Sequence, residues 1–292
     1  MNTSLDCLPC FFRQTLDAVR RVSDDTAFHE KVVRQAAEWV RNVDLSESPP
    51  VMARQLYRYL RELTGVADPY AEAKARDNEM ALRLLPGLRE RLAASNDPFT
   101  LAVRLAIVGN LIDLGAKSDL TTAEVESAIR DVEKEPFSGD VAALRQRAGK
   151  ARTILYLADN AGEIVLDRLL IEALGPERVT VAVRGAPIIN DATMEDARAA
   201  GLHELVEVIS NGSDVPGTLL EECAPDFRKH FDAADLVISK GQGNFETLSN
   251  APRDICFLFK VKCPVIANHV GLALGTQALV WLQGATKAKK KQ

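Results

Sequence analysis

The chain has 292 residues, 47% of them hydrophobic, and a formal net charge of -5. This length and apolar content suffice for one large globular domain or two ordinary ones. The slight acidic excess argues against a nucleic-acid partner, because neutralising backbone phosphates requires clustered lysine and arginine. With no apolar run of about 18 residues and no basic leader, we expect a cytoplasmic protein without a membrane partner, and the sequence leaves a homo-oligomer open.

The five cysteines are spread along the chain and do not form the framework of a small disulfide-rich domain. Two of them, Cys7 and Cys10, form a Cys-x-x-Cys pair near the start. This pair is compatible with half of a zinc site, with a redox pair, or with two ordinary thiols at the start of a helix. A complete zinc site would need ligands from far along the chain.

The first 150 residues predict a helical domain. Apolar residues recur there at helical spacing, for example at Leu56, Leu60 and Leu63. Segments that contain proline, glycine and asparagine separate these runs and indicate helix ends. The pattern predicts five or six helices.

Two polar residues interrupt one of these apolar runs. Asn110 and Asp113 are three residues apart in the segment Ile-Val-Gly-Asn-Leu-Ile-Asp, so on a helix they share one face. Polar side chains among apolar neighbours need partners. We expect both residues to face a cleft between the two halves of the protein and to contact substrate there; a hydrogen bond between helices is the alternative.

Residues 151–292 predict a Rossmann-like α/β domain. Short β-branched runs alternate there with amphipathic stretches, and we expect strands at 153–157, 179–183, 205–209, 236–239 and 264–267. Strands that are apolar on both faces and separated by helices indicate a parallel sheet covered on both sides. We therefore expect an α/β protein in which an N-terminal helical portion, residues 1–150, packs on this sheet domain.

Polar side chains follow the first two predicted strands. Asp159 and Asn160 come directly after the first strand, and Asp191 lies beyond the second. Ligands of open parallel sheets bind beyond the carboxyl ends of the strands. Carboxylate and amide oxygens suit Mg²⁺ or Mn²⁺, so we predict one ion at these three residues with positions open for water and substrate. A helix N-cap and turn at Asp159 and Asn160 is the alternative.

The fourth predicted strand runs into a glycine-containing loop. Lys240, Gly241, Gly243 and Asn244 lie in the segment Lys-Gly-Gln-Gly-Asn. Glycines let backbone N–H groups approach an oxyanion, while the lysine supplies a positive charge. The loop therefore predicts an anion site, with a glycine-rich turn bearing a surface lysine as the alternative.

A second pair of lysines precedes the last predicted strand. Lys260 and Lys262 are two residues apart and share one face of an extended run. One of them is placed to reach a phosphate; an edge strand with solvated lysines is the alternative.

Several unusual blocks occur in order between residues 7 and 263. They are residues 68–70 (Asp-Pro-Tyr) with Lys74 and Asn78, 109–113 (Gly-Asn-Leu-Ile-Asp), 159–163 (Asp-Asn-Ala-Gly-Glu), 240–246 (Lys-Gly-Gln-Gly-Asn-Phe-Glu) and Lys262-Cys263. Together they resemble the damage-control phosphatase family, also called DUF89 or acidic-residue-methyltransferase-like. The segment Cys-Leu-Pro-Cys at residues 7–10 resembles the prokaryotic branch of that family.

The resemblance implies a two-part protein that uses a divalent metal ion (Mn²⁺, Mg²⁺, Co²⁺ or Ni²⁺) to hydrolyse small phosphorylated metabolites, such as sugar phosphates or damaged phosphometabolites. Lys262 matches the family lysine that contacts phosphate. Phe259 and Lys260 stand where eukaryotic members have arginine and threonine, so this sequence departs from those members in a motif on which the substrate assignment depends. The family's metal ligands match Asp159, Asn160 and Asp191.

These observations assign roles to named residues. The predicted catalytic residues are Asp159, Asn160, Lys240 and Lys262. The predicted substrate contacts are Asn110, Asp113, Glu163, Gly241, Gly243 and Asn244. The attacking group is either Asp159 or a metal-bound water. The rival functions are S-adenosylmethionine-dependent carboxyl methylation of a protein and a non-enzymatic, metal-binding regulatory role.

Overall fold

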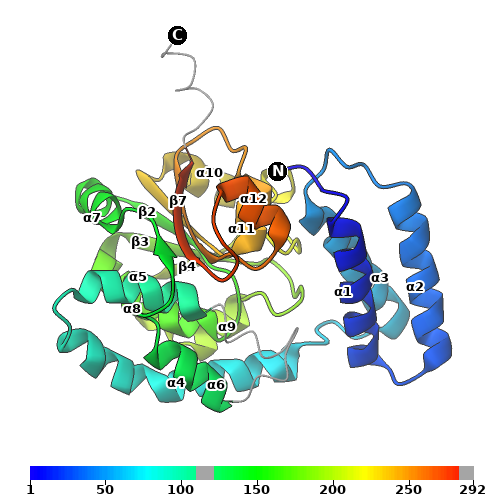
Figure 1. The fold of residues 1–292 in the computed structure, drawn as a ribbon, viewed down its shortest axis with the longest axis horizontal. Helices are drawn as coiled ribbons and strands as arrows, with labels where there is room; N and C mark the ends of the chain where they lie inside the picture. The colour runs from blue at the N-terminus through cyan, green and yellow to red at the C-terminus, as the bar shows by residue number, and fades with distance from the viewer. Residues whose placement is uncertain (110–121, 283–292) are drawn as a thin grey trace, which may run out of the picture.

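The computed structural model describes residues 1–109 and 122–282, and this part of the chain forms one seven-stranded sheet and twelve α-helices (Figure 1). The strands are β1 (Phe137–Ser138), β2 (Ile154–Leu157), β3 (Val179–Val183), β4 (Glu207–Ser210), β5 (Leu236–Lys240), β6 (Ile255–Lys260) and β7 (Gln277–Leu282). The N-terminal helices are α1 (Cys7–Val22), α2 (Thr26–Arg41), α3 (Pro49–Thr64), α4 (Ala71–Ala93), α5 (Pro98–Val108), α6 (Thr122–Arg130) and α7 (Val141–Lys150). The later helices are α8 (Glu163–Leu174), α9 (Met194–Ala199), α10 (Pro225–Ala233), α11 (Gln242–Leu248) and α12 (Pro264–Val270), with 3-10 turns at Pro176–Arg178, Leu202–Glu204 and Leu220–Glu222.

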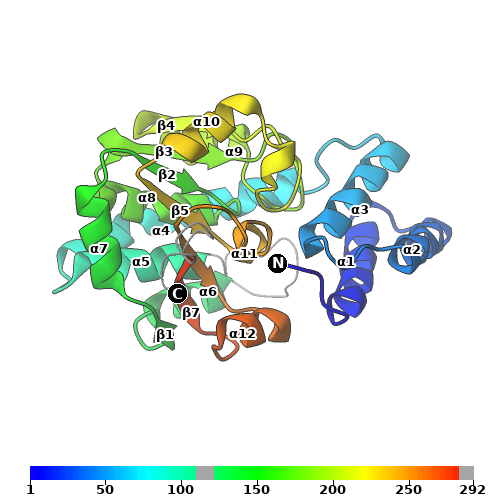
Figure 2. The same ribbon diagram turned by 90° about the horizontal axis from the view of Figure 1, so that it is seen from above.

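The sheet is mostly parallel, with strand order β1-β7-β6-β5-β2-β3-β4. Only the β6–β7 pairing is antiparallel. The chain runs outward from β2 through β3 to β4 and then returns to β5 on the other side of β2, as Figure 2 shows. The topological switch point therefore lies between β2 and β5, where open α/β sheets bind their ligands. This topology confirms the predicted Rossmann-like α/β fold.

One predicted strand is wrong. Residues 264–267 belong to α12, and the strand in this region is the preceding run, β6. Pro264 is the first residue of the helix, where a missing N–H costs nothing, because that group would have no partner within the helix. In a central strand the same proline would remove a ladder hydrogen bond. The short β1 and the antiparallel β7 were not predicted.

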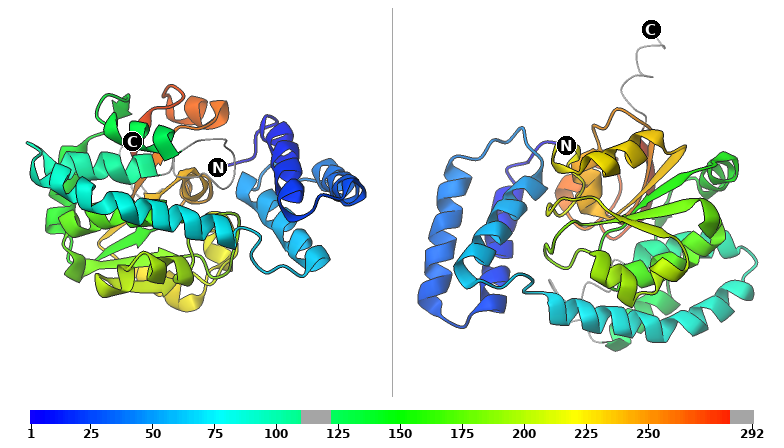
Figure 3. Two further views of the ribbon diagram at one scale, coloured as in Figure 1. Left: turned by 90° about the horizontal axis from the view of Figure 1, so that it is seen from below. Right: turned by 180° about the vertical axis from the view of Figure 1, so that it is seen from behind.

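Each face of the sheet carries its own hydrophobic core. Alternate residues of β2 point to opposite faces: Tyr156 packs with residues of α4, α5 and α8, and Leu155 packs with residues of α10, α11 and α12. Figure 3 shows these two helical layers from below and from behind. Burial on both faces explains why the parallel strands read as continuous apolar runs. No helix in the described residues is long and apolar enough to cross a membrane.

The helices before the sheet fall into two groups. Helices α1–α3 stand beside the sheet domain in Figure 1 and form most of a third core, which includes Val19, Val32 and Leu56. Ile188, from the loop after β3, also belongs to this core. Helices α4–α7 share the core of the sheet instead. The region up to residue 150 contains seven described helices rather than five or six, and the last two, α6 and α7, are short.

Candidate active site

The candidate site lies where β2 and β5 end side by side. Leu157 pairs with Ser239 in the sheet, so Asp159 and Gly241 follow at the same edge. Gly241 has a φ of +77°, and a Cβ atom built on it would lie 1.9 Å from Asp159 Oδ2. Only glycine lets the backbone after β5 pass directly against this carboxylate.

The loop after β3 turns back across the end of β2. Asn160 and Asp191 form an isolated antiparallel bridge, and the Ala192 N–H donates to the Asp159 carbonyl at 2.7 Å. Ile189 in this loop has a φ of 46°, a left-handed conformation that β-branched residues rarely adopt. Such strain persists where surrounding contacts determine the backbone, often at functional sites. The fold thus brings the three predicted metal ligands, Asp159, Asn160 and Asp191, to one place.

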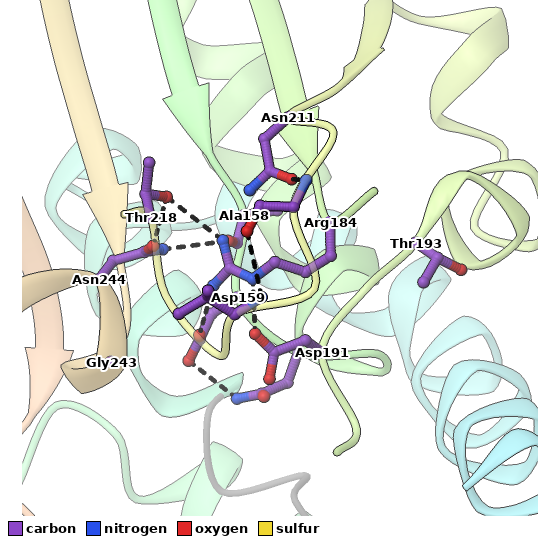
Figure 4. A network of polar contacts seen from close by, with 12 residues as sticks. Ala158, Asp159, Arg184, Asp191, Thr193, Asn211, Thr218, Gly243 and Asn244 are labelled. Carbon is purple, nitrogen blue, oxygen red and sulfur yellow. Dashed lines mark hydrogen bonds and ion pairs between the residues drawn. The ribbon is translucent and has the colours of Figure 1, made fainter. Parts of the chain in front are cut away.

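Arg184, which the sequence analysis missed, lies between the two carboxylates (Figure 4). Its Nε donates to Asp191 Oδ2 at 2.6 Å, and its Nη2 lies 3.5 Å from Asp159 Oδ1. Its Nη1 donates to Thr218 Oγ1 at 3.4 Å, and Thr218 in turn donates to Asn244 Oδ1 at 2.8 Å. The feature of the sequence that could have identified Arg184 was its position directly after β3, at the edge of the sheet where ligands bind.

Two of the predicted substrate contacts, Asn244 and Gly243, have close neighbours within the protein. Asn244 is fully buried, and its Nδ2 donates to the carbonyls of Lys240 at 2.7 Å and Ala158 at 3.2 Å. These bonds tie the start of α11 to the ends of β5 and β2. A Cβ atom on Gly243 would lie 2.5 Å from the carbonyl oxygen of Pro216, so this glycine accommodates a neighbouring loop.

Lys240 lies beneath the site rather than on the surface of a loop. It is the last residue of β5 and has no exposed area. Its Nζ donates to Glu163 Oε1 and Asp167 Oδ1, both at 2.6 Å, and to the Ala106 carbonyl at 2.8 Å. Tyr156 donates its hydroxyl to the same Asp167 oxygen at 2.8 Å. Three acceptors match the three N–H bonds of the ammonium group.

The charges of this buried group stabilise one another. Burial by itself would lower the pKa of Lys240, but the carboxylates of Asp167 and Glu163 raise it above its ordinary value. Burial raises the pKa of Asp167 to about 6, against the opposing effect of Lys240. Lys240 therefore remains an ammonium ion at neutral pH.

Asn160 connects the two ionic groups. Its Nδ2 donates to Asp159 Oδ2 at 2.9 Å and to Glu163 Oε2 at 3.1 Å. Because the amide nitrogen is held by both carboxylates, the amide oxygen is the atom that Asn160 can offer to a cation. Glu163, which was predicted to contact substrate, thus orients Asn160 and links it to Lys240.

The electrostatics of the site fit a cation. Burial, then Glu163 and Asp191, raise the pKa of Asp159 well above its usual range, while Arg184 and Lys262 oppose this effect. A bound divalent ion would favour the ionised carboxylate and offset that cost. No three His, Cys, Asp or Glu side chains within residues 1–109 and 122–282 are arranged to hold a metal ion. The predicted ligands Asp159, Asn160 and Asp191 are not a group of this type, because one of the three is an amide.

Of the two lysines around the end of β6, only Lys262 is near this site. Lys260 pairs with Glu135, with its Nζ 2.9 and 3.0 Å from the two carboxylate oxygens. Lys262 is exposed, its N–H donates to Gln242 Oε1 at 3.2 Å, and its charge acts on Asp159. Lys262 therefore lies on the open side of the site.

Helix α4 supports the site from below. Lys74 Nζ bonds to Asp196 at 3.0 Å and pairs with Asp68 at 2.8 Å, while Asn78 Nδ2 donates to the other oxygen of Asp196 at 3.0 Å. Asn78 Oδ1 accepts a hydrogen bond from the Gly162 N–H at 2.7 Å. These family-like residues thus hold the start of α8, which carries Glu163, against Asp196 in α9, the helix that follows the loop with Asp191.

Two predicted substrate contacts, Asn110 and Asp113, lie outside the described residues. The chain before them reaches the site, because a Cβ atom on Gly109 would lie 3.3 Å from Cγ of Glu163.

The Cys-x-x-Cys pair lies at the start of α1. Burial raises the pKa of Cys7, the hydrogen bond with the Ser4 backbone opposes this, and the neighbouring Glu246, Cys263 and Cys10 raise it further. A raised pKa lowers the fraction of thiolate in the metal-free protein. All five cysteines are free thiols, and the described residues contain no complete cysteine-rich metal site.

Fold and site together define a class: a doubly wound α/β protein with a carboxylate–amide cluster at its switch point. The chain belongs to the family described as damage-control phosphatase ARMT1-like domain, whose model matches residues 3–278. This match confirms the family resemblance seen in the short sequence blocks.

Relatives and a solved structure agree with this assignment. The chain is 35% identical to a damage-control phosphatase of Archaeoglobus fulgidus, over 94% of this chain and 97% of that protein. It is 34% identical to a damage-control phosphatase of Pyrococcus horikoshii, over 98% of this chain and 100% of that protein. It is also 34% identical to an uncharacterized protein of Methanocaldococcus jannaschii, over 94% of each chain. The crystal structure of a DUF89 family protein from Pyrococcus horikoshii matches with a TM-score of 0.87 and 32% identity, over 97% of this chain and 100% of that one.

Proposed function

We propose that this protein is a divalent-metal-dependent phosphatase that hydrolyses small phosphorylated metabolites. The observation that carries the proposal is the convergence of Asp159, Asn160 and Asp191 at the switch point, with Lys262 on the open side. Relatives named damage-control phosphatases over nearly the full chain support the reaction class. Sugar phosphates and damaged phosphometabolites are the substrate classes to test first.

The side chains divide the work of phosphoryl transfer. Asp159, Asn160 and Asp191 would hold the ion, which supplies Lewis-acid polarisation of the phosphoryl group. Lys262 would bind a phosphoryl oxygen and stabilise the negative charge that develops there. Water attacks phosphorus, the bond from phosphorus to the ester oxygen breaks, and the leaving alkoxide takes up a proton.

The contacts of Asp159 favour water over this carboxylate as the attacking group. Its Oδ2 accepts a hydrogen bond from Asn160 and lies against Gly241, and its Oδ1 faces Arg184. An acid quench during turnover of a ³²P-labelled substrate should therefore trap no phosphoprotein. A trapped acyl phosphate on Asp159 would assign the attack to that residue.

Lys240 takes a positioning role in this proposal instead of the predicted phosphate contact. Its three bonds hold Glu163 and Asp167, and Glu163 orients the amide of Asn160. The lysine thus acts on the reaction through a cation ligand.

We also propose a domain division different from the one predicted at residue 150. The third core, formed mostly by α1–α3, supports a helical domain that ends near residue 65, with α4–α7 belonging to the sheet domain. Ion pairs join the two: Arg58 bonds to Asp214 at 2.5 Å, and Arg61 bonds to Asp214 and to the Pro187 carbonyl. The helical domain therefore adjoins the loops that carry the site and is placed to select substrates.

The test is phosphate release by metal-stripped protein, with Mg²⁺, Mn²⁺, Co²⁺ or Ni²⁺ added back, from a panel of sugar phosphates and p-nitrophenyl phosphate. We expect metal-dependent release by the wild type and its loss in Asp159→Ala and Asp191→Ala. Asp226→Ala, which removes an exposed carboxylate in α10, should keep full activity. No release with any metal would contradict the proposal and favour methyl transfer or a binding role.

A further inference from the structure

Arg184 is among the largest fully buried side chains of the protein, with 2% of its surface exposed. Removing a guanidinium group from water is costly unless its N–H groups find partners. Buried arginines in natural proteins therefore commonly bond through both edges of the planar group. For Arg184 the relevant contacts are the hydrogen bonds made by Nε, Nη1 and Nη2.

The guanidinium of Arg184 is only partly satisfied. Its Nε–Asp191 bond, at 2.6 Å, has the length of a strong charge-assisted hydrogen bond, but the Nη1–Thr218 contact is long, at 3.4 Å. Buried Nη2 has no hydrogen-bond partner among the described residues, and it lies 3.5 Å from Asp159 Oδ1. The end of the side chain therefore carries an unused donor directed into the candidate site.

The backbone around Arg184 is fixed. The N–H of the next residue, Gly185, donates to the Ser213 carbonyl at 2.8 Å and to Asn211 Oδ1 at 3.0 Å. A Cβ atom on Gly185 would lie 2.4 Å from the carbonyl carbon of Gly212, so the two loops touch through their backbones. Any rearrangement of Arg184 is thus confined to its side chain.

We propose that Arg184 is the counter-cation of Asp159 and Asp191 in the metal-free protein, and that its Nη2 edge binds a phosphoryl oxygen once a divalent ion takes over the two carboxylates. This inference rests on the proposed function, since it assumes the same carboxylates and a phosphorylated ligand. A guanidinium and a divalent ion compete for the same carboxylate oxygens, so each weakens the binding of the other. The planar N–H fork released by this competition has the geometry that phosphate groups prefer.

Two binding measurements on the folded protein test the inference without relying on turnover. Calorimetry measures the Kd of Mn²⁺ for metal-stripped protein, and then the Kd of inorganic phosphate for Mn²⁺-loaded protein. In Arg184→Gln we expect Mn²⁺ to bind about 10-fold more tightly, because the competing charge is gone. Phosphate should bind about 10- to 100-fold more weakly, because a charge-assisted hydrogen bond is lost.

Two further variants keep the test interpretable. Arg184→Lys retains the charge but not the fork, so Mn²⁺ affinity should stay near that of the wild type while phosphate affinity falls. Arg168→Gln alters another inward-facing arginine, which bonds to the Ala200 carbonyl away from the site, and should change neither affinity. Thermal unfolding of all variants verifies that they are folded at the temperature of the titrations.

The opposite directions of the two changes separate this role from a structural one. If Mn²⁺ and phosphate affinities fall together in Arg184→Gln, or if neither changes, the inference is overturned even when the wild type hydrolyses phosphate esters. If the affinities change in opposite directions but no ester is hydrolysed, the inference stands and the proposed function fails. Absence of Mn²⁺ binding by the wild type overturns both.

Discussion

Two buried ionic clusters lie side by side at the ends of β2 and β5. Each contains one cation and two carboxylates, and they differ in how completely the N–H groups of the cation are bonded. In the inner cluster, Lys240 donates three short hydrogen bonds, two of them to the carboxylates of Glu163 and Asp167. In the outer cluster, Arg184 makes one strong bond to Asp191 and leaves Nη2 without a hydrogen-bond partner among the described residues.

The difference teaches how function can be separated from stability in a buried charge cluster. A cation whose N–H groups are all bonded within the protein, as in Lys240, has no donor left for a ligand, so its role is to hold geometry. In the same cluster Asp167 Oδ2 is buried without a hydrogen-bond partner among the described residues. A buried cation with an unused N–H group, such as Arg184, keeps a donor that a ligand can engage. Asn160 lies between the two, because its amide bonds to Asp159 on one side and to Glu163 on the other.

The largest effect is expected from breaking the inner cluster. Lys240→Met would leave two carboxylates buried without their cation, which should cost about 3–5 kcal/mol of unfolding free energy. Activity should fall as well, because Glu163 would no longer orient Asn160. Urea unfolding measures the stability, and Lys229→Met, at an exposed lysine, is the control. A Lys240→Met protein of wild-type stability would show that the three hydrogen bonds of Lys240 do not stabilise the inner cluster.

The contact between β5 and the outer cluster is tested by Gly241→Ala. The left-handed backbone should cost about 1–2 kcal/mol, and the collision of Cβ with the Asp159 carboxylate a further 1–3 kcal/mol or so. Gly65→Ala is a matched control, since Gly65 has a φ of +68° and nothing within 4 Å of its Cβ position. Thermal unfolding and Mn²⁺ binding should both distinguish the two variants; equal losses would argue against the close approach to Asp159.

The open side of the outer cluster is tested by Lys262→Ala. Loss of one charge-assisted hydrogen bond to phosphate should lower kcat/KM by about 10- to 100-fold with little change in stability, because the side chain is exposed. Lys260→Ala removes the neighbouring lysine that pairs with Glu135, and it should leave kcat/KM unchanged. Equal kinetics for the two variants would remove Lys262 from the phosphate site.

The smallest effect is expected at the ion pairs between the two domains, which are partly open to solvent. Burial would raise the pKa of Asp214, but Arg58 and Arg61 outweigh it and lower that pKa. The resulting stability is present above the unfolded pKa of about 4 and is lost as pH falls through the lower folded pKa. Asp214→Asn should therefore cost about 1 kcal/mol at pH 7 and almost nothing at pH 3.

Urea unfolding of the wild type and Asp214→Asn at the two pH values measures this difference. Asp226→Asn, in an exposed pair with Lys229, should show a smaller difference than Asp214→Asn. A loss that persists unchanged at pH 3 would show that packing, rather than charge, joins the domains there.

The short motifs and the periodicity of the chain determined the architecture. Apolar runs placed β2, β3, β4 and β5 close to where they lie, because strands buried on both faces need continuous apolar residues. The acid and amide residues after those runs lie together at one edge of the sheet, as predicted, because parallel strands end together. Local sequence also carried the family resemblance, which the family model confirms.

Only the tertiary structure decided how the charged residues are paired and buried. Lys240 reads as a loop lysine in sequence, yet it lies beneath the site, since Glu163, Asp167 and Ala106 reach it from helices distant in the chain. Arg184 gave no pattern of its own, because its meaning depends on two carboxylates that separate strands bring beside it. Hydrophobic periodicity reports which residues are buried but not which partners they meet, and the pairing of charges across elements decides what this site can bind.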